Sequence, residues 1–215
     1  MSDIVIHGVP GSPYVRSALL GLEEKGLPYR LAVMPMGGCR TEEHLQRNAF
    51  ARIPVMEHDD FCLYETQAIL RYADSLGSGP SLVPENARAA ARMNQIVGIV
   101  DWYLFPSMTV GITAERLMSQ HFWGRPADET NIAKALPQAR TCVRELERLK
   151  GGSEFMAGDR ISIADLMLAP QLEYFRVTAE GAELLKGTSL EGWLIRMSVR
   201  NSMQATQTER LRKTA

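Results

Sequence analysis

The sequence has few cysteines, no large excess of positive or negative charge, and no long uninterrupted apolar run. Its 215 residues include three cysteines and no CxxC pair, which argues against a disulfide framework, a zinc site or a dithiol redox motif. The formal net charge of −1 gives no basic field for nucleic acid or an anionic membrane. No apolar run approaches the roughly 18 residues of a membrane span. The first residues lack the basic and apolar regions of a secretory signal. We therefore expect a cytoplasmic protein that binds no nucleic acid, membrane or metal.

Strand and helix signals alternate in the first third of the chain. Apolar residues make up 45% of the sequence, which is typical of an ordinary globular protein. The alternation of strand, helix and strand favours a βαβ unit with parallel strands. The predicted elements are a strand at 4–7, a helix along 15–22, a strand at 29–33, a short helix at 41–47, a hairpin of 54–58 and 61–64, and a helix from 65 to 77.

The remainder of the chain carries helical patterns and no strand pattern. Gly77 and the Gly-Pro-rich residues after it have the composition of a linker. One long helix or two are expected over 85–120. Another helix is expected to have Pro126 in its first turn, with a kink or a frayed start at Pro137. The polar residues 201–215 are expected to be loosely held. The predicted division is an α/β domain at 1–77, a linker at 78–87 and an all-helical domain at 88–215.

Ser12 is the first candidate functional residue. It falls between the first strand and the first helix, directly before Pro13. Free backbone N–H groups and the positive end of the helix dipole favour an anion there, and the hydroxyl can donate a hydrogen bond to a bound thiolate. The alternative is that Ser12 only caps the helix. The two roles are compatible.

Ile53-Pro54 is the second candidate, an X-Pro pair just ahead of a predicted strand. A cis bond at this position would leave the N–H and C=O of Ile53 free to pair with a peptide ligand as an added strand. A trans proline at a strand edge is the alternative that the residues alone favour.

Glu65 and Thr66 open the predicted third helix. The Thr66 hydroxyl and the helix-starting N–H groups are suited to a ligand carboxylate, and the Glu65 carboxylate to an ammonium group. A capping pair without a ligand is the alternative.

Ser162 and Asp165 approximate a capping box, flanked by Ile161 and Leu166 as a hydrophobic staple. The helix that follows is apolar on all sides, so we expect it to be buried. This motif is assigned to folding and not to catalysis.

These motifs, in this order and spacing, resemble the glutathione transferase family over nearly the whole chain, with closest similarity to the serine-type bacterial, theta-like and phi-like branch. The resemblance implies a thioredoxin-like α/β N-terminal domain plus an all-α C-terminal helical domain, glutathione as co-substrate and a homodimer. It also implies that Ser12 activates the glutathione sulfur. The glutathione-binding residues that it implies are Ser12, Arg40, Arg52, Ile53, Pro54, Glu65, Thr66 and, toward the partner subunit's ligand, Asp101.

The resemblance further implies conjugation of glutathione to a small hydrophobic electrophile, in a pocket between the domains. The candidate pocket residues are Val9, Gly11, Tyr14, Trp102, Tyr103, Phe105 and Met108. The aromatic residues among them also suit an ordinary helix-bundle core. Tyr14 is a rival to Ser12 as the hydroxyl donor. Two departures from the family pattern are Ala49 in place of a proline after Asn48, and Cys39 near the position where some members have a histidine.

Two alternative functions stay open. One is a different glutathione-dependent enzyme on the same scaffold, such as an isomerase, dehalogenase or peroxidase. The other is a non-catalytic protein that keeps the fold in order to bind a ligand or partner.

Overall fold

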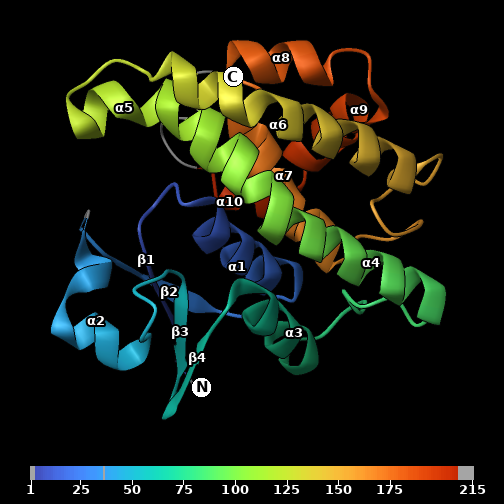
Figure 1. Ribbon diagram of the computed structural model, residues 1–215. Coiled ribbons are helices and arrows are strands. Elements are labelled where there is room, and N and C mark those ends of the chain that lie inside the picture. The colour runs from blue at the N-terminus through green and yellow to red at the C-terminus, as the bar shows by residue number, and fades with distance from the viewer. Residues whose placement is uncertain (1–2, 36, 208–215) are drawn as a thin grey trace. The chain divides into compact units, whose positions relative to one another are not determined.

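The computed structural model describes residues 3–35 and 37–207, which form two compact units (Figure 1). The first unit contains the described residues up to Val83 together with those from Arg200 onward, and the second runs from Pro84 to Val199. The boundary between the two units, after Val83, lies inside the predicted linker of residues 78–87. The C-terminal end differs from the prediction, because the chain returns to the first unit at Arg200. Residues 208–215 of the predicted helical domain lie outside the described part.

The first unit is built on a four-stranded mixed sheet. Its strands lie in the order β2-β1-β3-β4. Strands β1 and β2 pair in parallel, whereas β3 pairs antiparallel with both β1 and β4. The predicted βαβ unit and hairpin are therefore confirmed. The strands are β1 (Ile4–Gly8), β2 (Tyr29–Val33), β3 (Val55–His58) and β4 (Phe61–Tyr64).

Two helices, α1 (Pro13–Glu24) and α3 (Thr66–Leu76), pack against each other and form the apolar core with the sheet. Alternate residues of β1 point to this side because side chains in a strand have a period of two. The short elements η1 (Gly38–Arg40) and α2 (Glu42–Arg47) connect β2 to β3. The buried core consists of Ile4, Ile6, Val15, Ala18, Leu19, Leu22, Met56, Ile69 and Ala73.

A short C-terminal helix, α10 (Asn201–Ala205), packs against α1 within the first unit. The buried Arg16 guanidinium donates to the Met203 carbonyl at 3.0 Å and to the Thr206 hydroxyl at 3.3 Å. Arg200 donates two hydrogen bonds to the Glu24 carboxylate, at 3.0 and 2.7 Å. The prediction that residues after 200 are loosely held is therefore wrong as far as 206. Polar side chains of this C-terminal segment, those of Arg200 and Thr206, are hydrogen-bonded to residues of α1.

The second unit contains only helices among its described residues. A continuous helical stretch runs through α4 (Ala87–Ile99), η2 (Val100–Ala114) and α5 (Glu115–Trp123), and η2 is π-helical. The sequence predicted a helix here but not the wider π turns, which include Pro106. The remaining helices are α6 (Glu129–Lys150), α7 (Ile163–Phe175), α8 (Ala179–Leu185) and α9 (Ser189–Ser198).

Helix α6 begins later than predicted. The Asp128 side chain caps it by accepting hydrogen bonds from the N–H groups of Thr130 and Asn131. Pro126 therefore precedes the helix and does not lie in its first turn. Pro137 lies inside the helix, which continues to Lys150.

Helix α7 is buried along its whole length, as predicted. The fully buried Asp165 carboxylate accepts hydrogen bonds from the Ser162 N–H at 2.9 Å and from the Ser162 hydroxyl at 2.8 Å. It also accepts from the Met156 N–H and the Trp193 indole, both at 2.9 Å. Burial raises the pKa of Asp165, and these hydrogen bonds oppose that shift. Asp165 thus joins three segments of the helical unit.

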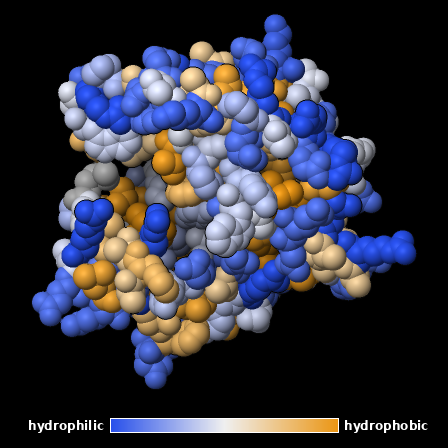
Figure 2. Space-filling model, in the orientation of Figure 1, coloured by the Kyte–Doolittle hydropathy of each residue, from blue (hydrophilic) through white to orange (hydrophobic). Residues whose placement is uncertain are grey.

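By length and composition alone, the helical stretch Ala87–Trp123 could cross a membrane, since an 18-residue window in it has a mean hydropathy of 1.4. The sequence prediction considered only uninterrupted apolar runs and missed it. Core helices of water-soluble bundles meet the same criterion, and η2 packs against α6 and α7. Figure 2 shows hydrophilic residues interspersed with hydrophobic ones over the face in view.

Candidate functional site

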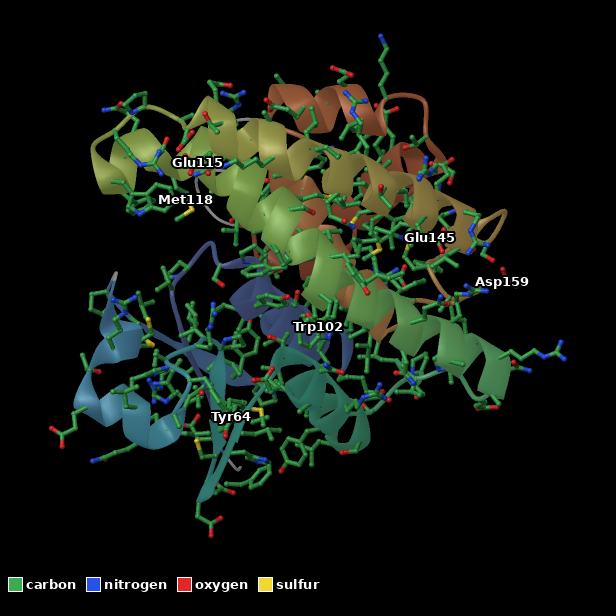
Figure 3. The ribbon with its side chains drawn as sticks, in the orientation of Figure 1. Tyr64, Trp102, Glu115, Met118, Glu145 and Asp159 are labelled. Carbon is green, nitrogen blue, oxygen red and sulfur yellow. The ribbon has the colours of Figure 1, made fainter. Side chains whose placement is uncertain are left out.

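The pairing of the strands brings the predicted site segments of the first unit to one edge of its sheet. His7 near the end of β1 pairs with Val55 at the start of β3, which pairs with Tyr64 at the end of β4. The end of β2 lies at this edge as well, because β2 is parallel to β1. The segments with Ser12, Ile53, Glu65 and Arg40 therefore all adjoin the same edge. Tyr64 marks it in Figure 3.

The loop from β1 to α1 positions Ser12. Gly8 ends the strand where a Cβ atom would lie 2.4 Å from Val15 Cγ2, so only glycine allows this close approach. Gly11 has a φ of 90°, which glycine adopts at little cost. The Ser12 N–H then donates to the Val9 carbonyl at 3.1 Å, and the Ser12 Oγ accepts from the Val15 N–H at 3.5 Å. Ser12 therefore caps α1.

The cap leaves the Ser12 hydroxyl available for a ligand. A hydroxyl has one donor and two acceptor lone pairs, and the cap uses one lone pair through a long hydrogen bond. The partly exposed hydroxyl donates to no group within the part of the chain that the structure describes. At a helix N-terminus, this donor is suited to an anionic sulfur.

The peptide bond between Ile53 and Pro54 is cis, and not the trans form that the residues alone favoured. No backbone hydrogen bond of Ile53 is made to any described residue. The carbonyl of the preceding Arg52 is held by two side chains, His44 Nε2 at 2.8 Å and Asn48 Nδ2 at 3.1 Å. The Ile53 N–H and C=O therefore have no hydrogen-bond partner among the described residues and can pair with a ligand.

Glu65 joins β4 to α3 in an uncommon backbone conformation. Its φ is 71° and its ψ is 112°, outside the regions that non-glycine residues favour. Strain of this kind clusters at functional sites, where the surrounding structure maintains it. The Glu65 carbonyl accepts from the N–H groups of Ala68 and Ile69. Thr66 begins the helix and is buried.

Arg40 and Arg52 supply positive charge near this edge. Both side chains are exposed, and neither guanidinium has a hydrogen-bond or ion-pair partner among residues 3–35 and 37–207. Cys39 beside Arg40 is a partly exposed free thiol.

Sequence reasoning missed a charged network on the sheet face away from α1 and α3. Glu57 Oε2 lies 2.6 Å from His7 Nε2, and Arg47 Nε donates to Glu57 Oε1 at 2.7 Å. Burial acts to raise the pKa of Glu57, but the hydrogen bonds from Arg47 and His7 lower it overall. The period of two along β1 and β3 places His7 and Glu57 on one face, and this signal could have indicated the pair.

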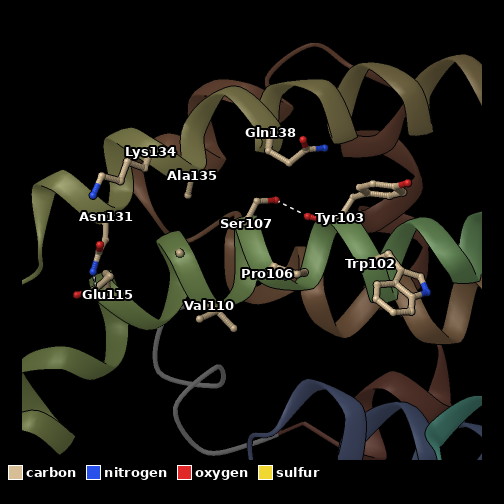
Figure 4. A pocket seen from close by; sticks show the side chains of 11 residues that line it. Trp102, Tyr103, Pro106, Ser107, Val110, Glu115, Asn131, Lys134, Ala135 and Gln138 are labelled. Atoms are coloured by element: carbon tan, nitrogen blue, oxygen red, sulfur yellow. Dashed lines mark hydrogen bonds between the residues drawn. The ribbon is translucent and has the colours of Figure 1, made fainter.

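The second unit has a groove of about 560 Å³ between η2 and α6. Gly111 lets these helices approach closely, since a Cβ atom there would lie 2.5 Å from Ala135 Cβ. Two predicted pocket residues line the groove, Trp102 and Tyr103, which are 78% and 55% exposed (Figure 4). The other lining residues include Pro106, Ser107, Val110, Asn131, Lys134 and Gln138.

The remaining predicted pocket residues do not line this groove. Met108 is fully buried in the core of the helical unit and Phe105 is partly exposed. Val9, Gly11 and Tyr14 are partly exposed on the loop and first turn around Ser12. Asp101 is half-buried at the start of η2. Among the described residues, no group of three or more His, Cys, Asp or Glu side chains could hold a metal ion.

The fold and the sheet-edge site define a two-domain protein, with a thioredoxin-like α/β domain and an all-helical domain. Comparison with known families agrees. The model for the glutathione S-transferase N-terminal domain matches residues 6–81, and that for the C-terminal domain matches residues 129–196. The chain therefore belongs to the glutathione S-transferase family, and its activity is that of a transferase that conjugates glutathione.

Individual relatives are similar over most of this chain. Glutathione S-transferase 4 of Zea mays is 29% identical over 165 residues, which cover 76% of this chain and 73% of the relative. Probable glutathione S-transferase GSTF1 of Oryza sativa subsp. japonica is 26% identical, with 95% of each chain covered. The crystal structure of glutathione transferase F7 from Populus trichocarpa superposes with a TM-score of 0.85 at 25% identity, covering 94% of this chain and 97% of that one.

Proposed function

We propose that this chain transfers the glutathione thiolate to a small hydrophobic electrophile, with Ser12 as the group that stabilises the thiolate. The observation that carries the proposal is that one sheet edge adjoins a hydroxyl donor, a backbone segment and two arginines that have no partner for these groups among the described residues. The relatives named glutathione S-transferases support it, several of them of the plant F type. We place the chain in the serine-type, theta-like and phi-like branch.

In this proposal glutathione lies along the sheet edge. Its cysteine backbone pairs with the free N–H and C=O of Ile53, in the manner of an added strand. The γ-glutamyl end lies at Glu65 and Thr66, where the α-carboxylate meets the helix N-terminus and the α-ammonium meets the Glu65 carboxylate. The glycine carboxylate is bound by Arg40, with help from Arg52.

The Ser12 hydroxyl acts on the acidity of the bound thiol. A free thiol has a pKa of roughly 8.5, so most of it is protonated at pH 7. The Ser12 hydrogen bond and the N-terminal end of the α1 dipole both favour the thiolate. Together they would lower that pKa by about two units if their combined preference for the thiolate is about 2.7 kcal/mol. The proton leaves to solvent, the sulfur forms a bond to the electrophilic carbon, and a leaving group such as halide departs with its bonding electrons.

The electrophile requires apolar surface more than directional contacts. In the first unit, the loop residues Val9, Gly11 and Tyr14 adjoin Ser12 and are proposed to contact the electrophile. In the second unit, the exposed aromatic rings of Trp102 and Tyr103 are proposed as apolar electrophile-binding groups. Phe105 and Met108 are proposed to shape the apolar surface from behind. Rate then comes from the thiolate fraction and from proximity of the two reactants.

We further propose that the protein is a cytoplasmic homodimer with a detoxifying role. The exposed apolar ring of Phe50, at 67% exposure, supports association. In a dimer, Asp101 would reach the ammonium group of glutathione in the partner subunit. Analytical ultracentrifugation tests the assembly, and a monomer at micromolar concentration would contradict it.

Glutathione-dependent turnover of a generic aryl halide, beside calorimetric glutathione binding, tests the function. We expect binding and turnover. Binding without turnover across a panel of aryl halides, epoxides, hydroperoxides and enones would show a glutathione-binding protein without the proposed activity. Turnover of hydroperoxide alone would assign a peroxidase, and absence of binding would contradict the site itself.

A further inference from the structure

The two side chains that hold the Arg52 carbonyl have no part in the proposed chemistry. His44 lies in α2 and Asn48 directly follows it, and they are 2% and 1% exposed. Their donors, Nε2 of His44 and Nδ2 of Asn48, lie 2.8 and 3.1 Å from the same carbonyl oxygen. We name this pair with its acceptor the Arg52 clamp.

The roles of the atoms in the clamp follow from their partners. Asn48 Oδ1 accepts from the Phe50 N–H at 3.0 Å, so Nδ2 is the atom that faces Arg52. The Arg52 carbonyl can only accept, so His44 Nε2 carries the hydrogen. His44 Nδ1 is buried without a hydrogen-bond partner in the described residues. The clamp therefore uses both lone pairs of one carbonyl.

Holding this carbonyl also aims the next N–H group. The Arg52 C=O and the Ile53 N–H belong to one planar peptide group, in which a trans bond directs them to opposite sides. The clamp holds the carbonyl at one edge of that planar group, and the free Ile53 N–H points from the opposite edge. A rotation of this plane would turn the N–H away from a ligand lying along the sheet edge.

We propose that His44 and Asn48 are positioning residues for glutathione, which orient the Arg52–Ile53 peptide group so that its N–H meets the carbonyl of the ligand's cysteine. The inference rests on the proposed function, since it concerns the same site. The clamp acts on binding of the peptide and not on the sulfur. Its loss therefore weakens glutathione binding and leaves the chemical step at saturating glutathione unchanged.

Substitution of single donor atoms tests the clamp. Asn48→Asp keeps the acceptor for the Phe50 N–H and the shape of the side chain, but loses the donor to Arg52. His44→Leu loses the other donor, whereas His44→Gln keeps an N–H donor. We expect the glutathione Kd and KM to rise roughly tenfold in Asn48→Asp and His44→Leu. In these variants kcat and the electrophile KM should stay within about twofold, and His44→Gln should recover most of the affinity.

The alternative of a merely structural role gives a different pattern. It predicts that kcat and both KM values change together, in step with a loss of thermal stability and without recovery in His44→Gln. That pattern, or an unchanged glutathione Kd in folded variants, would overturn the clamp alone. A wild-type protein that fails to bind glutathione would overturn the proposed function and the clamp with it.

Discussion

The first unit offers directional polar groups at its sheet edge, whereas the second offers mainly apolar surface in its groove. Ser12, the Ile53 backbone and the two arginines are polar groups with directional hydrogen-bonding geometry. Trp102 and Tyr103 present mostly ring surface to the groove. Sites built from hydrogen bonds reject a wrong ligand strongly, while apolar sites discriminate weakly. In the proposed function, this contrast assigns selectivity for the thiol co-substrate to the first unit and tolerance of varied electrophiles to the second.

Both units also rely on buried polar residues, but for different purposes. In the second unit Asp165 holds segments of the bundle together. In the first unit His44 and Asn48 hold the Arg52 carbonyl, and Arg16 holds the Met203 carbonyl. Changes in the second unit should therefore act mainly on stability, and changes in the first on stability and glutathione binding together.

The largest expected effect is that of Asp165→Ala. It leaves the N–H groups of Met156 and Ser162 and the Trp193 indole without their acceptor in a buried place. We expect a loss of about 3–5 kcal/mol in the free energy of unfolding, measured with urea. Asp159→Ala removes an exposed carboxylate six residues earlier and is the matched control. A similar small change in both variants would contradict the role of Asp165.

Arg16→Met tests the corresponding contact in the first unit. The variant keeps a long apolar side chain but leaves the Met203 carbonyl without the Arg16 donor. We expect a loss of about 2 kcal/mol in unfolding free energy and faster proteolysis of the C-terminal segment. Arg30→Met, at an exposed arginine of β2, is the control. Equal stability of the two variants would show that the Arg16 contacts to the C-terminal segment add nothing to the unit.

Glu115 gives a pH-dependent test within the second unit. Hydrogen bonds from Arg125 lower the pKa of Glu115 to about 2, although burial opposes the shift. Because the folded pKa lies below the ordinary value of 4.5, its stabilising effect is full above pH 4.5 and is lost as the pH falls toward 2. We expect Glu115→Gln to be less stable than wild type at pH 6, with a gap that narrows below pH 4.5. A gap independent of pH would contradict the ion pair.

The smallest effect on stability is expected for Trp102→Ala. The ring is exposed, so the unfolding free energy should change by under about 0.5 kcal/mol. The electrophile KM should rise severalfold for bulky aromatic substrates, while the glutathione Kd stays constant. Phe122→Ala alters another exposed ring, outside the groove, and serves as the control. A changed glutathione Kd would break the division of roles between the units.

The periodic parts of the fold could be predicted from the sequence. Alternating apolar runs predicted the hairpin of β3 and β4, and stripes every third or fourth residue predicted α1 and α3, since packing on a single core enforces both periods. Ser12, Pro54 and Glu65 indicated the candidate site because each directly flanks a strand or helix end, and the pairing of β1, β3 and β4 brings those ends to one edge of the sheet. The capping box of Ser162 and Asp165 could also be predicted, because its hydrogen bonds join residues that are close in sequence.

Contacts between distant residues could not be predicted in this way. Arg16 and Met203 lie far apart in the chain, and nothing in the polar composition after residue 200 indicates that these residues bind α1. The clamp of His44 and Asn48 on Arg52 depends on where α2 ends, which sequence patterns locate only to within a few residues. The π turns of η2 follow from packing and not from a repeat.

The acidity of the bound thiol tests the central claim most directly. Glutathione bound to wild type and to Ser12→Ala would be titrated by its thiolate absorbance, with calorimetry to confirm saturation. We expect an apparent pKa about two units below the free value of roughly 8.5 in wild type, and a return most of the way to that value in Ser12→Ala. The same lowered pKa in both proteins would contradict Ser12 as the thiolate partner and would direct attention to Tyr14 or the helix dipole.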